Sequence, residues 1–502
     1  MQESICDTAS RITGFSASKS DDSKVTDSFG HVLPSVTHHL NVGNMPLAID
    51  GTLFEKQMSF NRGKTVERIV HPCGAGVFGY FEASKSCKDL TKACIFSDAG
   101  KRTPVFVRFS TTTYGKEYPD SARNVRGFAI KFYTEDGNMD LLGLNWPVFF
   151  TRDPMKGPDV IRSQQRNPKT FCLNYEELFK YAAENPESLH AITMHFSDRG
   201  TPVGFARMDG FGVHTFKWVN ETGNAVYIKY HWLCQQQKQD FTDEDAEKMC
   251  GTDPDFAKRN LFEQVENGSE LKWKFSVQIM TIDQSQTVDF DPFDCTKVWP
   301  HAEFPLTEIG TLVLNRNPEN YHRDVEQSAF SPGNLIPGIE PSPDPLLQWR
   351  VMFYRDAQYH RLGVNHHQIP VNCPFMAKHV NPQSRDGELR VDDNGSSKSA
   401  IISSQENRSK VDQKADFQQV AIPNAKVSRE AGSRHEGTSS EFDQVRELFE
   451  RVLQGKAKEN LLRNTAKYLQ RCSEETQQKY LSQLGNISQE YKDGVVRCFV
   501  QV

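Results

Sequence analysis

Alternating apolar and polar positions dominate the chain between residues 66 and 310 and predict β-strands there. Five runs rich in β-branched and aromatic residues fit this pattern: Thr103–Ser110, Gly127–Thr134, Gly212–Val219, Asn224–Trp232 and Lys274–Ile282. Two of these runs flank Asn220-Glu-Thr-Gly223, whose composition is typical of a hairpin turn. Val226, Ile228 and Tyr230 alternate along the second strand of that hairpin and would share one face. We therefore expect an antiparallel sheet that closes into a barrel.

Helical periodicity interrupts the strand pattern at two places. Asn174–Ala183 and Phe256–Val265 carry apolar residues at helical spacing, which predicts helices inserted between groups of strands. An antiparallel sheet with helices inserted between its strands belongs to the α+β class. We therefore expect an α+β fold with a barrel at its core.

The end of the chain is also predicted to be helical. Ser440 and Asp443 resemble a capping box. Five apolar residues follow at i, i+3, i+4, i+7 and i+8: Val445, Leu448, Phe449, Val452 and Leu453. Three further residues repeat this theme: Tyr480, Leu481 and Leu484. The chain is therefore expected to end in a helical domain that packs on the barrel.

Two polar stretches divide the chain. Residues 1–40 are rich in Ser, Asp, Lys and Thr and are predicted to form an arm that needs other surfaces to become ordered. Between residues 385 and 440 the only aromatic is Phe417, which indicates a long connection wrapping a surface. The predicted units are an N-terminal arm (1–40), a barrel core (41–384), a wrapping connection (385–440) and a C-terminal helical domain (441–502).

Composition narrows the class of partner and the compartment. A net charge of −6 argues against nucleic acid and anionic membranes, because binding either one requires a basic face. No run reaches the roughly 18 apolar residues of a membrane span. Eleven cysteines without any C-x-x-C pair suit reduced thiols. We expect an intracellular protein, peroxisomal or cytoplasmic, although its C-terminus, Cys498-Phe-Val-Gln-Val502, is not a Ser-Lys-Leu type signal.

One helical segment suggests a metal ligand. In Arg350-Val-Met-Phe-Tyr354, a guanidinium and a phenol lie four residues apart, so they share a helix face. An unperturbed tyrosine has a pKa of about 10, so a phenolate at neutral pH needs a nearby cation or a metal ion. Arg350 can supply that charge. The pattern alone is more often a surface pair, and its weight depends on the rest of the chain.

Several further motifs give the pair its meaning. Together with Arg350 to Arg361, three segments closely resemble the monofunctional, small-subunit haem catalases. These segments are Arg68-Ile-Val-His71-Pro-Cys-Gly-Ala-Gly, Pro104-Val-Phe-Val-Arg108-Phe-Ser110 and Asp291-Pro-Phe-Asp-Cys-Thr-Lys-Val-Trp-Pro-His301. The likeness runs from about residue 40 to the C-terminus. It implies a catalase-like barrel and haem b as the cofactor. It also implies a homotetramer with exchanged N-terminal arms.

The resemblance assigns the residues around the haem. Tyr354 is implied as the axial ligand of the haem iron, backed by Arg350. On the opposite face, His71 is implied as the base that moves a proton between the two peroxide oxygens, and Ser110 as its hydrogen-bond partner. Phe330 matches a residue on the Tyr354 side of the pocket. The haem propionates are implied to pair with three arginines: Arg68, Arg108 and Arg361.

The chain departs from the family at the peroxide side of the haem. Leu144 stands where the family has an asparagine that hydrogen-bonds the peroxide. Asn145 is one residue further on, and a one-residue shift on an extended segment points a side chain to the opposite face. Gly157 replaces a phenylalanine, which predicts a wider and less polar pocket, while Thr112 replaces a valine and adds a hydroxyl nearby.

The family's NADPH pocket is only partly present. Six positions match the family: His190, Ser197, Arg199, Val298, Trp299 and His301. Four positions differ from it: Met194, Asp209, Phe211 and Leu233. Asp209 adds an anion and Leu233 removes a cation, both unfavourable for a ligand that carries phosphate. NADPH binding is therefore doubtful.

Three functions remain open from the sequence. The leading hypothesis is a haem-dependent catalase that converts hydrogen peroxide to water and dioxygen, with turnover reduced because Leu144 removes a donor. A second is a haem enzyme acting on organic or fatty-acid hydroperoxides, similar to the catalase-related allene oxide synthases. A third is a haem-binding pseudo-enzyme, which the presence of both His71 and Tyr354 disfavours.

Overall fold

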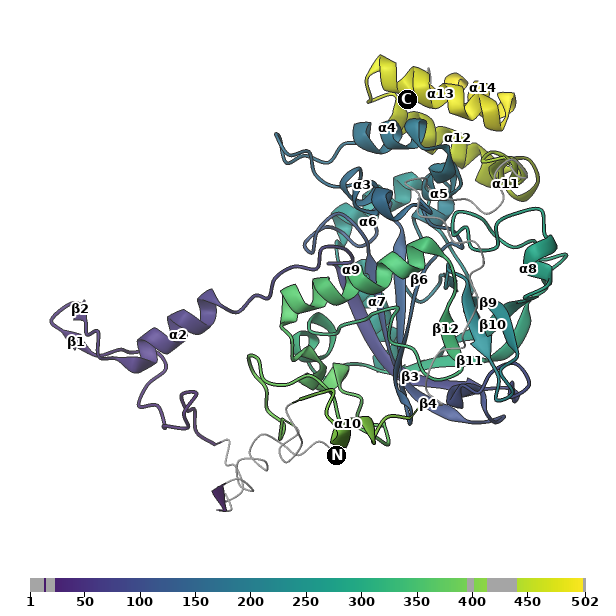
Figure 1. The fold of residues 1–502 in the computed structure, drawn as a ribbon. Helices are drawn as coiled ribbons and strands as arrows, with labels where there is room; N and C mark the ends of the chain where they lie inside the picture. The colour runs from purple at the N-terminus through teal and green to yellow at the C-terminus, as the bar shows by residue number, and fades with distance from the viewer. Residues whose placement is uncertain (1–12, 15–22, 395–400, 413–439, 500–502) are drawn as a thin grey trace.

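The computed structural model describes residues 13–14, 23–394, 401–412 and 440–499. Of the described strands, eight close into an antiparallel barrel (Figure 1). In order around the barrel these are β10 (Leu271–Thr281), β11 (Thr307–Arg316), β3 (Gly74–Ala83), β4 (Arg102–Thr111), β5 (Arg126–Thr134), β6 (Gly137–Leu144), β7 (Gly210–Phe211) and β9 (Ala225–Cys234). Pairing of β9 with β10 closes the ring, and β8 (Phe216–Val219) and β12 (Ile339–Pro341) extend it beside β9. The predicted barrel is confirmed.

Successive side chains of β4 point alternately into the apolar core and towards a cavity on the other face of the strand. Val105, Val107 and Phe109 enter the large apolar cluster inside the barrel. The residues between them point to the other face, where Arg108 and Ser110 line a cavity. Both faces of the strand are buried from Val105 onwards, and one of them carries Arg108 and Ser110 where it meets the cavity.

Strand register then aligns residues from three neighbouring strands. Ser110 pairs with Gly127 across β4 and β5, and Gly127 pairs with Leu144 across β5 and β6. On the other side of β4, Ser110 pairs with Gly74, the first residue of β3. His71 lies three residues before this strand. One end of the barrel therefore gathers residues that are far apart in the sequence.

Helix α9 (Pro345–Leu362) crosses in front of that end of the barrel (Figure 1). Asp344 caps its first turn, because its carboxylate accepts hydrogen bonds from the backbone N–H groups of Leu346 and Leu347 at 3.0 Å. Pro345 is the first helical residue, where a missing N–H costs nothing. The helix ends at Gly363, whose φ of 90° is a conformation that glycine adopts without strain.

The remaining helices cover the barrel. Those before the C-terminal region are α3 (Gly157–Arg162), α4 (Glu176–Glu184), α5 (Leu189–Phe196), α6 (Asp243–Thr252), α7 (Phe256–Glu266), α8 (Gln284–Thr287) and α10 (Gln405–Arg408). The C-terminal set is α11 (Asp443–Glu447), a π-helix (Leu448–Val452), α12 (Lys456–Leu469), α13 (Glu474–Ile487) and α14 (Gln489–Cys498). It stacks on α4 and α5 at the top of Figure 1 and shares one apolar cluster with them.

Three local predictions were wrong in detail. Gly212–Val219 is not one strand: only Phe216–Val219 forms β8, because the chain turns at Val213, whose φ is 63°. The tail does not continue as a regular helix through Val452, which is 58% exposed at the end of the π-helix. The predicted capping box is half formed, since Asp443 accepts from the Ser440 N–H while Ser440 Oγ accepts from the Phe442 N–H.

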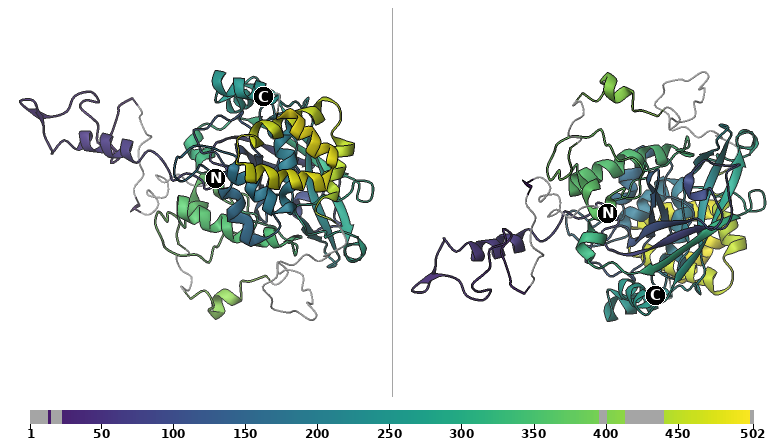
Figure 2. Two further views of the ribbon diagram at one scale, coloured as in Figure 1. Left: turned by 90° about the horizontal axis from the view of Figure 1, so that it is seen from above. Right: turned by 90° about the horizontal axis from the view of Figure 1, so that it is seen from below.

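The described N-terminal part of the chain projects from the body in all three views, and this projecting segment extends beyond residue 40, where the arm was predicted to end (Figures 1 and 2). It carries β1 (Asn41–Val42), β2 (Met45–Pro46) and α2 (Gly51–Asn61), and no residue of α2 is buried. Phe54, Met58 and Phe60 are exposed on this helix. Of the predicted wrapping connection, residues 395–400 and 413–439 lie outside the described residues.

Candidate active site

A cavity of about 430 Å³ lies between strands β4 to β6 and helix α9, and we call it the main cavity. The residues that the sequence singled out all line it: Arg68, His71, Arg108, Ser110, Phe330, Arg350, Tyr354 and Arg361. They come from the segment before β3, from β4, from α9 and from the loop before β12. The fold therefore brings the whole predicted set together in one place.

His71 is held against β4 and β5. Its Nδ1 lies 2.9 Å from Ser110 Oγ, and its backbone N–H donates to the Thr112 carbonyl at 2.9 Å. Its φ of 62° is rare for a residue with a side chain. A Cβ added at Gly127 would stand 2.5 Å from His71 Nδ1, so only glycine leaves room for the ring. With Nδ1 occupied, Nε2 is the ring nitrogen left for a ligand.

The charge state of His71 follows from its surroundings. Burial lowers its pKa to about 3, and the nearby guanidinium groups of Arg108, Arg350 and Arg68 contribute to the same shift. The imidazole is therefore neutral at neutral pH and has one nitrogen free to accept a proton.

Arg350 and Tyr354 meet on α9 as their spacing predicts. Arg350 Nη2 donates to the Tyr354 hydroxyl at 3.1 Å, and its guanidinium carbon lies 5.2 Å from the centre of the Tyr354 ring. Arg350 itself is 5% exposed. A buried cation thus lies directly beside the phenol oxygen, where it would stabilise a phenolate.

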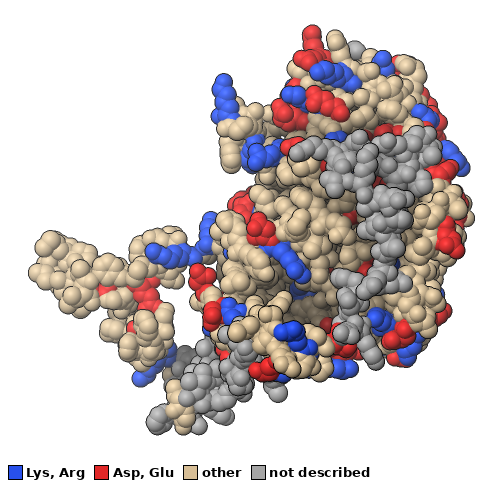
Figure 3. Space-filling model, viewed as in Figure 1, with Lys and Arg blue, Asp and Glu red and all other residues tan. Residues whose placement is uncertain are grey.

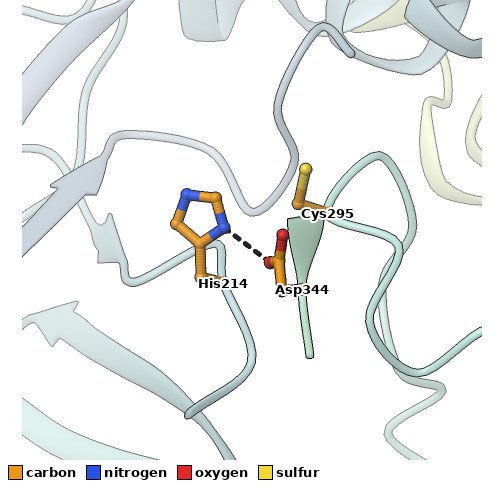
Figure 4. Close-up of side chains that lie close together, drawn as sticks. All are labelled: His214, Cys295 and Asp344. Atoms are coloured by element: carbon orange, nitrogen blue, oxygen red, sulfur yellow. Dashed lines mark hydrogen bonds and ion pairs between the residues drawn. The ribbon is translucent and has the colours of Figure 1, made fainter. Parts of the chain in front are cut away.

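A further hydrogen-bonded pair anchors the start of the same helix (Figure 4). His214 Nδ1 lies 2.6 Å from Asp344 Oδ2, while the other carboxylate oxygen of Asp344 caps α9. The Cys295 thiol is close to both and donates to the Thr151 carbonyl at 3.2 Å. Because the Asp344 carboxylate bonds both His214 and the first turn of α9, we interpret the His214–Asp344 pair as the anchor of α9.

Three arginines close the opposite rim of the main cavity. Arg68 and Arg361 donate to carbonyls in and after the π-helix Tyr321–Glu326, including that of Glu326 at 2.6 Å and 2.7 Å respectively. Arg108 donates to the carbonyl of His71 at 2.8 Å. Backbone carbonyls orient these guanidinium groups without neutralising their charge.

This rim carries an excess of positive charge. Burial lowers the pKa of Arg361 to about 10, and the charge of Arg108 adds to the effect. Arg68 lies 3.5 Å from the Glu326 carboxylate, which also pairs with Lys116 at 3.3 Å. Arg68 Nη1 and Arg108 Nε are buried and have no hydrogen-bond partner among the described residues. The rim is therefore suited to hold anionic groups.

Aromatic side chains give the main cavity a flat apolar wall. Phe330 stacks on Phe106 with ring centres 6.2 Å apart and an angle of 20°. Both belong to a small cluster outside the barrel core. The Lys131 ammonium lies 5.0 Å from the centre of the Phe330 ring.

A smaller space of about 40 Å³ adjoins the main cavity, and we call it the side chamber. His71, Arg350 and Tyr354 line both spaces. The rest of its wall is mostly apolar: Val70, Val125, Leu144, Phe149, Phe150, Ile161, Trp349 and Phe353, with Thr112, Gly157 and Gln164. The predicted loss of a polar donor at Leu144 agrees with this wall.

Neither nearby polar residue replaces the lost donor. Asn145 uses both ends of its amide elsewhere, accepting from the Arg126 N–H and donating to the Arg199 carbonyl. Thr112 donates its hydroxyl to the Val125 carbonyl at 2.9 Å. Gln164 differs, because its Oε1 is buried without a hydrogen-bond partner among the described residues.

The expected widening at Gly157 was wrong. A Cβ built on Gly157 would lie 2.7 Å from Trp349 Cη2, so the indole already occupies the space beside this glycine. Trp349 precedes Arg350 on α9 and stacks on Phe353 with ring centres 4.9 Å apart. The aromatic side chain therefore comes from another part of the chain.

A separate cavity of about 600 Å³ contains most of the residues considered for NADPH. His190, Arg199, Val298, Trp299 and His301 line it, but Ser197 does not; its hydroxyl donates to the Met194 carbonyl. All four differing residues line it as well: Met194, Asp209, Phe211 and Leu233. The Asp209 carboxylate is paired with Lys238 at 3.0 Å, so its charge is partly compensated.

Sequence reasoning missed five residues that shape the site: Gly127, Gln164, His214, Asp344 and Trp349. Asp344 with Pro345 is a recognisable helix start, and this signal could have been read. The other residues contact partners far away in the sequence, so local pattern carries no sign of them.

Comparisons with known proteins agree with this arrangement. Residues 26–408 match the family model described as Catalase, and residues 435–497 match the model described as Catalase-related immune-responsive. A catalase from Methanosarcina barkeri is 48% identical over 381 residues, covering 76% of this chain and 75% of that protein. Catalase-A from Dictyostelium discoideum is 48% identical over 377 residues, covering 74% and 76% respectively.

Solved structures show the same likeness over nearly the whole chain. A fungal catalase superposes with a TM-score of 0.90 at 36% identity, covering 97% of this chain and 98% of that chain. Catalase A from Saccharomyces cerevisiae superposes with a TM-score of 0.91 at 36% identity, covering 96% and 99%. The similarity therefore includes the C-terminal helices as well as the barrel.

Proposed function

The chain belongs to the catalase family of oxidoreductases that decompose hydrogen peroxide, and we propose that it carries out this reaction on a haem b group held between His71 and Tyr354. The observation that carries the proposal is the convergence of a phenol backed by a buried cation, an oriented neutral imidazole and three arginines around one cavity.

The residues present fit a haem. The main cavity, at about 430 Å³, is within the usual size of cofactor sites, which is about 300–1,000 Å³. Arg68, Arg108 and Arg361 offer positive charge to two propionates, and Arg68 Nη1 and Arg108 Nε are buried N–H groups without a hydrogen-bond partner among the described residues. Phe330, which lines the cavity, offers apolar surface to a flat macrocycle. Tyr354 would hold the iron through its phenol oxygen, since tyrosine is the haem ligand of catalases.

When bound, the haem supplies the two-electron chemistry by which one peroxide is reduced to water and a second is oxidised to dioxygen. Around it, His71 Nε2 takes a proton from the near oxygen of a peroxide and delivers it to the far oxygen, so that water can leave. Ser110 makes this transfer productive by holding Nδ1 and thus the orientation of the ring.

On the other face, Arg350 donates a hydrogen bond to the phenol oxygen and places a positive charge beside it, which supports this oxygen as a ligand for iron. The His214–Asp344 pair fixes the start of α9 and therefore the positions of both residues. Within the side chamber, the Gln164 amide oxygen can accept a hydrogen bond from a peroxide hydroxyl, but as an acceptor it does not replace the donor lost at Leu144.

Hydrogen peroxide is favoured over a fatty-acid hydroperoxide. A side chamber of about 40 Å³ has room for only a few water-sized groups, since roughly 10–15 Å³ of such space holds one water. NADPH is left out of the proposed function, because the cavity considered for it has lost the cation at Leu233 and gained Asp209.

The proposal extends to a homotetramer and an intracellular setting. A projecting N-terminal segment whose helix α2 buries no residue and exposes Phe54, Met58 and Phe60 needs a second copy to cover it. The ten described cysteines are free thiols, which suits a reducing compartment, peroxisomal or cytoplasmic. Among the described residues, no helix is long and apolar enough to span a bilayer.

The division into an arm (1–40), a core (41–384), a connection (385–440) and a helical domain (441–502) is retained as part of the proposal.

An oxygen electrode tests the function directly. The purified haem-loaded protein should show a Soret band and release dioxygen from hydrogen peroxide, and a lipid hydroperoxide run in parallel should give little turnover. Tyr354→Phe should shift or abolish the Soret band. Turnover of the lipid hydroperoxide above that of hydrogen peroxide would contradict the proposal, as would a Soret band left unchanged by Tyr354→Phe.

A further inference from the structure

Trp349 on helix α9 packs against the opposite wall of the side chamber. The six-membered ring of Trp349 packs on Gly157, the first residue of α3, so closely that a Cβ there would stand 2.7 Å from Cη2 and 2.9 Å from Cζ3. Real Cβ atoms essentially never approach another atom so closely. Gly157 therefore provides the space into which the indole fits.

The indole is also held on its own helix. It stacks on Phe353 with ring centres 4.9 Å apart and an angle of 25°. Trp349 is next to Arg350 in the sequence, and Phe353 is next to Tyr354. The stacked rings therefore adjoin the hydrogen-bonded Arg350–Tyr354 pair. The ring cannot swing away without disturbing this stack, and it forms a fixed wall.

We propose that Trp349 is a specificity-determining residue, which limits the peroxide side of the site to hydrogen peroxide and excludes alkyl hydroperoxides. The side chamber adjoins His71 and has a volume of about 40 Å³. A hydrogen peroxide molecule fits this volume, whereas an alkyl group attached to the second oxygen requires space that the indole occupies. This inference rests on the proposed function, because it names the residue that sets the substrate class of the same site.

Ligands of ferric haem test the wall without any turnover. Cyanide has two heavy atoms and imidazole has five, and both can be titrated against the Soret band of the haem-loaded protein. Trp349→Ala should tighten imidazole binding about tenfold or more relative to cyanide, since a change of a few atoms in an apolar pocket is worth that much. Tyr359→Ala is the matched control, because it removes an exposed aromatic ring from the same helix, and it should leave the ratio as in the wild type.

Turnover with peroxides of increasing size gives a second readout. In Trp349→Ala, the ratio of kcat/KM for ethyl hydroperoxide to that for hydrogen peroxide should rise about tenfold or more above the wild-type ratio. The role of Trp349 would be overturned if the wild-type protein already binds imidazole as tightly as the variant does. It would also be overturned if Trp349→Ala leaves both the ligand-binding ratio and the kcat/KM ratio unchanged.

A double-mutant cycle keeps the test valid if the cavity in Trp349→Ala lowers stability. Gly157→Ala should lower the Tm in the wild type, because its methyl group meets the indole, and should cost little in the Trp349→Ala background. Additive effects on Tm would overturn the contact. A Soret band without peroxide turnover would refute the proposed function alone, since the ligand ratio still decides the role of Trp349; absence of the Soret band would refute both.

Discussion

Gly127 lies so close to His71 that a Cβ on this glycine would stand 2.5 Å from the Nδ1 atom of the imidazole. The same Cβ would lie 2.6 Å from Ser110 Oγ, the hydroxyl that orients the ring. β5 carries a glycine at the one point where it faces both partners of this hydrogen bond. The orientation of the proposed base therefore depends on the absence of a side chain.

Gly127→Ala should move His71 off Ser110 while leaving the barrel folded. A displaced general base typically costs about 10²-fold or more in rate. Dioxygen release from hydrogen peroxide should fall accordingly, with the Soret band retained. The control is Gly251→Ala, because nothing lies within 4 Å of a Cβ at that position. Equal turnover in both variants would contradict the steric account.

Arg350→Leu should weaken the bond between the phenol oxygen and iron. The variant removes a hydrogen bond of 3.1 Å and a buried positive charge, both of which support the oxygen as a ligand. The phenol oxygen then binds iron less tightly, so Arg350→Leu should retain less haem than the wild type after the same dialysis, as judged by the Soret band. Arg350→Lys, which keeps the charge, should lie between the two. Equal haem retention in Arg350→Leu and the wild type would count against this role.

Two substitutions in the wall of the side chamber should change dioxygen release in opposite directions. Leu144→Asn should raise dioxygen release from hydrogen peroxide by about 10-fold to 10²-fold, since a single preorganised donor can contribute that much. Gln164→Leu should lower it, because it removes a buried amide oxygen that has no partner among the described residues. In the double variant, the loss caused by Gln164→Leu should be smaller. Unaltered rates in both single variants would refute the importance of polar groups in the chamber.

A buried histidine outside the site should govern stability in acid. Burial, with help from Arg123 and Arg126, lowers the pKa of His195 to about 3, and neither ring nitrogen has a hydrogen-bond partner among the described residues. The unfolded chain takes up a proton on this histidine below its ordinary pKa of about 6.5, and the folded protein does not. Each such histidine therefore costs about 1.4 kcal/mol of stability per pH unit as the pH falls from about 6.5 towards 3.

His195→Leu should remove that contribution. The Tm should then fall less between pH 7 and pH 5 than it does in the wild type, when both are measured at one scan rate. His38→Leu changes an exposed histidine of the arm and should behave as the wild type. A fall in Tm as steep in His195→Leu as in the wild type would show that this side chain is not responsible.

Charge on the visible face agrees with a small uncharged substrate. In Figure 3, Lys and Arg atoms are interspersed with Asp and Glu atoms and do not gather in one patch of a single sign. A net charge of −6 points the same way. Steering of a charged macromolecule would need a broad field of one sign.

The pattern along the chain was enough for the features that depend on neighbours in sequence. Period-two alternation located β4, β5, β9 and β10, and helical spacing located α4, α7 and the Arg350–Tyr354 pair. It missed β3, β6 and β11, and glycines weaken the alternation in β3, where Gly74, Gly76 and Gly79 fall. The motifs shared with the family indicated which residues gather around the main cavity.

What the sequence by itself determined about this protein is therefore its class, its family and the identity of the groups that line the main cavity. Only the tertiary structure decided the shape of the side chamber. Gly157 alone suggested an opening, yet Trp349, nearly two hundred positions away in the sequence, fills that space. Gly127 likewise has meaning only beside His71. The reason is physical: hydrogen bonding and periodicity act between near neighbours, whereas packing depends on which distant surfaces the fold brings into contact.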